Sequence, residues 1–94
     1  GNREEVLVEK LLDNALIEAR SCERFRLLSL ELEDSYLKKF YHSFMISEAG
    51  HYRLFMDLAR IYKDKSYVDQ RWQDYLNYEV EIFKTIKIRG DRMH

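Results

Sequence analysis

The chain has 94 residues, of which 46% are hydrophobic and 35% are charged, and its net charge is −1. This length allows one small domain, and the near-neutral charge excludes the broad basic field of many nucleic-acid-binding proteins. A single cysteine excludes an intrachain disulfide, and no apolar run is long enough to cross a membrane, so we expect a cytoplasmic protein. Because there is no proline and only three glycines, the composition predicts an all-α fold.

The first predicted helix covers residues 3–30. Apolar residues recur along it at steps of three and four, which places them on one face of a helix. That face reads Leu7, Leu11, Ala15, Glu18, Cys22 and Phe25. Glu18 therefore interrupts a surface that should be buried, and burying an unpaired carboxylate is costly, so we expect a compensating partner for it.

The second predicted helix covers residues 36–62 and follows a break at 31–35, where Asp34 or Ser35 would be the N-cap. Its apolar face reads Leu37, Tyr41, Phe44, Glu48, His51, Phe55, Leu58 and Tyr62. Glu48 and His51 are the two exceptions to its apolar character. A Glu three residues before a His places an oxygen and a nitrogen ligand on one side of one helical turn, and di-iron carboxylate bundles use this half-site twice.

The third predicted helix covers residues 67–88, after a turn at 63–66 in which Ser66 would be the cap. Gly90 is expected to end this helix. The residues predicted to face inward are Val68, Trp72, Tyr75, Leu76, Glu79, Phe83 and Ile86. The tail that follows is rich in cations, namely Lys84, Lys87, Arg89 and Arg92 against Asp91. We interpret it as a solvated helix end, with a patch for nucleic-acid phosphates as the alternative.

Three potential ligands converge when the first two helices pair. A short turn makes these helices antiparallel neighbours, and Glu18 and Glu48 lie at similar distances from that turn. Two carboxylates and one imidazole suit iron or manganese better than structural zinc, so Glu18, Glu48 and His51 are predicted to bind a metal. The alternative is a pair of buried acids held by tyrosines or by arginines such as Arg20, Arg24 or Arg53.

Other side chains are weaker candidates for the site. Glu79 could be an outer ligand or could accept a hydrogen bond from His51, although a packing role is the favoured interpretation. Cys22 could line the site, but a small core residue is the default interpretation. His42 falls one residue off the apolar face, and His94 is terminal.

Several segments of the chain resemble one known family. The segments are Ile17-Glu18-Ala19-Arg20-Ser21-Cys22-Glu23-Arg24-Phe25, Lys39-Phe40-Tyr41, Ser47-Glu48-Ala49, His51-Tyr52 and Glu79-Val80-Glu81. They resemble the tRNA methylthio-isopentenyl-adenosine hydroxylases, the MiaE family, and the nine-residue block is the most specific of them.

This resemblance implies a ferritin-like helical bundle and a non-haem di-iron monooxygenase. Such an enzyme uses dioxygen and an electron donor to hydroxylate the isopentenyl group of a modified adenosine beside the tRNA anticodon. The resemblance also implies that Glu18 is the carboxylate ligand from one helix. Glu48 and His51 would then be the ligands from the next helix, with Glu48 bridging the irons.

Two features depart from the family pattern. Gly50 stands where the family commonly has Arg, which costs about 1 kcal/mol of helix propensity. The family's bundle also needs a Glu helix and a Glu-x-x-His helix from each of two halves, whereas residues 1–94 resemble only the C-terminal half. We therefore expect a three-helix half of a bundle, with two long antiparallel core helices and a third packing helix. Either an N-terminal half or a second copy in a homodimer would complete it.

Two other functions stay open at this level. A ferritin- or rubrerythrin-like bundle that oxidises iron or scavenges peroxide shares the same ligand set. A non-enzymatic helical fragment that oligomerises around an empty site is the third interpretation. Because the sequence starts at Gly1 rather than Met, we also expect a longer gene product. The nine-residue block favours the hydroxylase.

Overall fold

The computed structural model describes residues 2–92, and it describes side chains as far as residue 86. Three α-helices follow one another along the chain: α1 (Asn2–Glu31), α2 (Ser35–Tyr62) and α3 (Lys65–Arg92). The described residues contain no strand. The predicted all-α fold is therefore confirmed. The ends of α1 and α2 lie within one residue of their predicted bounds, and the two ends of α3 differ from theirs by two and four residues.

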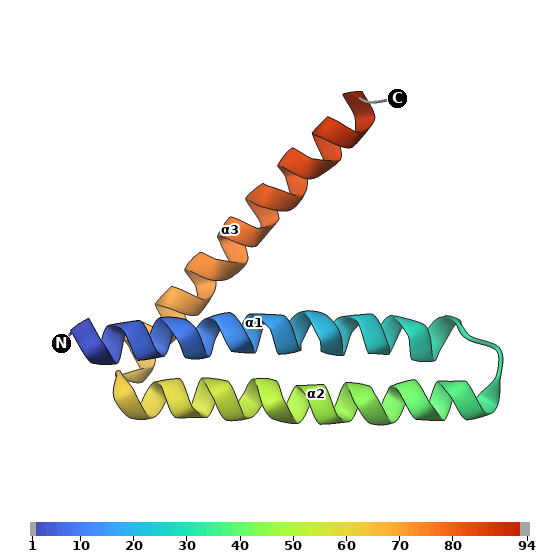
Figure 1. Ribbon diagram of the computed structural model, residues 1–94, viewed down its shortest axis with the longest axis horizontal. Coiled ribbons are helices and arrows are strands. Elements are labelled where there is room, and N and C mark those ends of the chain that lie inside the picture. The colour runs from blue at the N-terminus through green and yellow to red at the C-terminus, as the bar shows by residue number, and fades with distance from the viewer. Residues whose placement is uncertain (1, 93–94) are drawn as a thin grey trace.

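Helices α1 and α2 lie side by side and antiparallel, joined by a tight turn (Figure 1). Asp34 is the N-cap of α2, because its Oδ1 accepts a hydrogen bond from the backbone N–H of Leu37 at 2.9 Å. The two helices have 30 and 28 residues, so each extends for about 42–45 Å at 1.5 Å per residue. The long hairpin of α1 and α2 is the central part of the molecule.

The ends of α3 differ from the prediction. Asp64, not Ser66, caps the first turn, since Asp64 Oδ1 accepts from the backbone N–H of Tyr67 at 3.0 Å and the helix begins at Lys65. At the other end α3 continues to Arg92, so Gly90 does not end it. A glycine weakens a helix by about 1 kcal/mol without forbidding it.

The hydrophobic core lies where the three helices meet, at the end of the hairpin far from the α1–α2 turn (Figure 1). Its fully buried members are Val8, Leu12, Ala15, Met56, Ala59 and Val68. The predicted face of α1 was therefore one position off near its start, since Val8 and Leu12 are buried while Leu7 and Leu11 are only partly covered. The reason is that residues buried between three helices are shifted toward the side on which α3 docks.

Helix α3 packs through its first half only and then leaves the hairpin at an angle (Figure 1). Arg71 Nε donates to Glu9 Oε1 at 2.7 Å and Tyr75 donates to the same carboxylate, which anchors the first half to α1. Beyond this point Phe83 and Ile86 are 68% and 61% exposed, so the prediction that they face inward was wrong.

The projecting α3 gives the molecule an open shape. Its radius of gyration is 16.4 Å, compared with about 12 Å for a compact chain of this length. In the tail, Lys84 lies 3.6 Å from Glu81, whereas the side chains of Lys87, Arg89 and Arg92 fall outside the described residues. The phosphate patch therefore stays a prediction. None of the described helices combines the length and the apolar character that crossing a membrane requires.

Candidate metal centre

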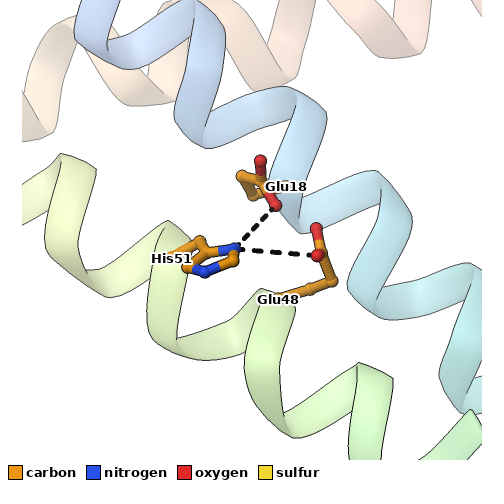
Figure 2. A group of neighbouring side chains, drawn as sticks. All are labelled: Glu18, Glu48 and His51. Atoms are coloured by element: carbon orange, nitrogen blue, oxygen red, sulfur yellow. Dashed lines mark ion pairs between the residues drawn. The ribbon is translucent and has the colours of Figure 1, made fainter.

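Glu18 of α1 and Glu48 and His51 of α2 meet near the middle of the hairpin (Figure 2). One ligand atom from each residue lies within 4.8 Å of the others. His51 Nδ1 is 3.5 Å from Glu18 Oε2 and 3.6 Å from Glu48 Oε1. Figure 2 shows the imidazole facing both carboxylates, so the structure brings together the three residues that the sequence singled out.

The hairpin fixes the positions of these side chains. The turn of residues 32–34 is too short to allow α1 and α2 to slide, so it sets which residues lie opposite each other. One turn beyond Glu18, Cys22 Sγ donates to the backbone carbonyl of Met45 at 3.5 Å and ties the helices together beside the site. Side chains carried by paired helices are held more rigidly than side chains on loops, which suits metal binding.

The two carboxylates lie in a confined space. The side chains of Glu18 and Glu48 are 23% and 19% exposed. Glu18 Oε2 is buried and has no hydrogen-bond partner in the described part of the chain. The pKa of Glu48 is raised, first by a hydrogen bond that it shares with Glu18, then by burial and by repulsion from the Glu18 charge, while His51 opposes the shift.

This arrangement fits a cation. Two acids that crowd each other and leave one oxygen unsatisfied are stabilised when a divalent ion replaces the shared proton. Carboxylate oxygens with one imidazole nitrogen are ligands that iron and manganese accept. The donor chemistry and the unsatisfied oxygen therefore both match the predicted metal.

The alternative interpretation, acids held by arginines, is not supported for the described residues. Arg20 binds Glu79 instead, with Nη2 2.8 Å from Oε2. The described ion pairs of Glu18 and Glu48 are with His51. The same contact bears on the suggested outer role of Glu79, which stays a prediction. Its carboxylate lies with Arg20 between α1 and α3 and does not join the ligand group, because α3 docks away from the site.

One side of the site is open. The His51 side chain is 54% exposed, and no further acid, histidine or cysteine joins the group within the described residues. Further along α2 toward the α1–α2 turn, Phe40 packs edge-on against Phe44 with ring centroids 4.7 Å apart. Sequence reasoning left out Phe40 because it is not on the predicted apolar face, although its spacing of four from Phe44 was a usable signal.

A helical hairpin with two carboxylates and a histidine at its centre is an arrangement that carboxylate-rich helical bundles use to bind metals. The chain belongs to the family described as tRNA-(MS[2]IO[6]A)-hydroxylase (MiaE), which matches it over residues 1–94. The resemblance drawn from the sequence is therefore confirmed, and the three helices are consistent with a fragment of a ferritin-like bundle.

Two curated relatives share the name tRNA 2-(methylsulfanyl)-N(6)-isopentenyladenosine(37) hydroxylase. The protein of Pseudomonas putida is 47% identical over 60 residues, which is 64% of this chain and 29% of the relative. The protein of Salmonella typhimurium is 48% identical over 54 residues, which is 57% of this chain and 20% of the relative. The chain thus spans less than a third of either relative. No solved structure matches the chain.

Proposed function

We propose that this chain is part of a cytoplasmic tRNA hydroxylase and that Glu18, Glu48 and His51 bind its iron. The observation that carries the proposal is the meeting of the three ligand atoms within 4.8 Å, in a chain that belongs to the MiaE family. Both relatives are named for a hydroxylation of an isopentenyl-modified adenosine of tRNA, and we propose the same substrate here.

The proposed reaction inserts one atom of dioxygen into a C–H bond of the isopentenyl group. The second oxygen atom leaves as water, which requires two electrons and two protons from an electron donor. Iron, when bound, would supply the activation of dioxygen. The role of this chain's residues is to provide two anionic ligands and one neutral imidazole, and to hold them on two helices whose register is fixed.

We further propose that this chain supplies half of a di-iron centre. Three ligands suffice for one iron, whereas the bundles of this class use a Glu and a Glu-x-x-His pair from each of two halves. The predicted apolar face of α2, which carries His51, is partly exposed toward both ends of the helix, where Leu37 and Tyr62 are 39% and 46% exposed. A patch of this kind is typical of a surface that packs against another part of a protein.

A second copy could complete the centre. Two hairpins related by a two-fold axis would place two Glu helices and two Glu-x-x-His helices around one site. The rest of a longer chain could provide the same elements. Both arrangements cover the apolar face, and the number of chains in the assembly separates them.

The test is an assay of the chain with ferrous iron, dioxygen, a chemical reductant and an anticodon stem–loop RNA that contains isopentenyladenosine. Mass spectrometry of the nucleosides is expected to detect the gain of one oxygen atom. Glu48→Ala should abolish the product, while Glu81→Ala, which removes a largely exposed carboxylate on α3, should not. A dimer of the chain that binds two irons and gives no product would contradict the proposal, and catalytic oxidation of free ferrous iron in its place would favour a ferritin-like activity.

A further inference from the structure

We propose that the aromatic side chains between the metal centre and the α1–α2 turn form the binding site for the modified base. The aromatic cluster consists of Phe25, Phe40, Tyr41 and Phe44. In this proposal Phe40 and Phe44 contact the adenine ring and its apolar isopentenyl group. The inference rests on the proposed function and assigns its substrate to particular residues.

The four rings pack against one another across the hairpin. Phe25 of α1 lies 5.4 Å from Phe44 and 5.9 Å from Tyr41 of α2, measured between ring centroids. Phe40 lies 5.5 Å from Tyr41 and 4.7 Å from Phe44. These contacts are within the range of favourable aromatic pairs, so the rings are held in place before any ligand arrives.

Part of the cluster is accessible. Phe40 and Phe44 are 44% and 42% exposed, although large aromatic side chains are usually well covered. Together with Ser43 and Ser47 they line a cavity of about 260 Å³. This volume is near the lower end of ligand-binding clefts, about 300 Å³, and it suits one base better than a stretch of RNA.

The chemistry of this cavity matches a purine that carries an apolar chain. Proteins recognise unpaired RNA bases by stacking them on aromatic side chains and by hydrogen bonds to their polar edges. The phenyl rings provide the apolar walls. Ser43 Oγ donates to the backbone carbonyl of Lys39 at 3.0 Å and can still accept a hydrogen bond. Ser47 makes no side-chain hydrogen bond with the described residues, so its hydroxyl is available to donate.

The residues that line the cavity lie within about one to two helical turns of the metal ligands on α2. Phe44 lies four residues before Glu48, and Ser47 lies four residues before His51, so each pair shares one face of α2 with a rise of about 6 Å. A base held by the two phenyl rings can therefore extend its N6 substituent toward the ligands. The hydrophobic core lies at the other end of the hairpin.

The experiment measures binding of two anticodon stem–loop RNAs, one with isopentenyladenosine and one with plain adenosine, to the chain under anaerobic conditions. Wild-type chain is expected to prefer the modified RNA. Phe44→Leu and Phe40→Leu keep an apolar side chain but remove the aromatic face, and each should weaken binding of the modified RNA roughly tenfold, because stacking of one base on an aromatic side chain is worth on that order. Phe83→Leu is the matched control, since it makes the same change at an exposed position of α3.

The outcomes separate the two proposals. Unchanged affinity for the modified RNA in both cluster variants, or an equal loss of affinity in the Phe83→Leu control, would overturn the base-binding site. A loss of dimer mass in the cluster variants with this affinity intact would overturn it too and would assign the rings to an interface between copies. Iron content is measured on the same samples. Selective RNA binding without iron contradicts only the proposed function, whereas iron binding without RNA preference contradicts only the base-binding site.

Discussion

Replacing Glu48 with Gln removes one of two carboxylates that crowd each other and keeps the shape of the side chain. The ligand oxygens of Glu18 and Glu48 lie within 4.8 Å, where two unit charges repel by about 3 kcal/mol at an effective dielectric constant of about 20. The side chain of Glu48 is 19% exposed, so water screens part of this repulsion. We therefore expect the variant to gain about 1 kcal/mol of stability at pH 7 when no iron is present.

The pH dependence gives this prediction a second signature. Because the pKa of Glu48 is raised in the folded chain, the folded state keeps its proton more tightly than the unfolded state does. The wild-type free energy of unfolding should fall as the pH rises from the ordinary value of 4.5 to the raised value, and Glu48→Gln should lack this fall.

Urea unfolding of both chains in the presence of a chelator, at one protein concentration and a series of pH values, measures the difference. Ferrous iron should reverse the order, since it stabilises a folded state that binds it and the wild-type site binds better. A variant that is less stable than wild type without iron at pH 7 would refute the idea that the two carboxylates repel each other.

Three further predictions follow from the rest of the fold. Gly50→Ala should raise the free energy of unfolding by about 1 kcal/mol in the same urea assay. The reason is that Gly50 is inside α2 and that a Cβ added there would have nothing within 4 Å. A decrease in the free energy of unfolding would show that the position is constrained. Glu9→Gln should destabilise the docking of α3 by about 1–3 kcal/mol, because Arg71 and Tyr75 lose their charged partner. In this variant, amide hydrogen exchange should become faster in α3 before it does in the hairpin. Because Arg71 lowers the pKa of Glu9, the stabilisation by this contact should be present above pH 4.5 and be lost as the pH falls below it. Light scattering should give the mass of a dimer or a larger assembly, and a monomer with a cooperative melt would contradict the need for a covering partner.

The hairpin could be predicted from the sequence because its signals are local. Helix-period apolar faces, the Asp34 cap and a near absence of glycine and proline all act within a few residues. The direction of α3 could not be predicted in the same way. Its second half carries apolar residues at helical spacing, but nothing in that spacing reveals whether a partner surface is present. Phe83 was therefore placed inward although it is exposed.

The site illustrates the same limit. The proximity of Glu18, Glu48 and His51 could be predicted by counting residues from the turn. In an antiparallel hairpin, residues at equal sequence distances from the turn lie opposite each other along the two helices. Glu79 could not be assigned by counting, because its position depends on the side on which α3 docks. In the structure Arg20 reaches it across the outer face of α1 and forms an ion pair at 2.8 Å.

The most direct test of the central claim is the number of iron ions bound per chain, measured by anaerobic equilibrium dialysis together with the native mass. We predict saturable binding of one iron per wild-type chain and no specific binding to Glu48→Ala, whose helix content measured by circular dichroism should stay close to wild type. Full binding by Glu48→Ala at unchanged stoichiometry, or no saturable binding by the wild-type chain, would contradict the assignment of Glu18, Glu48 and His51 as the iron ligands.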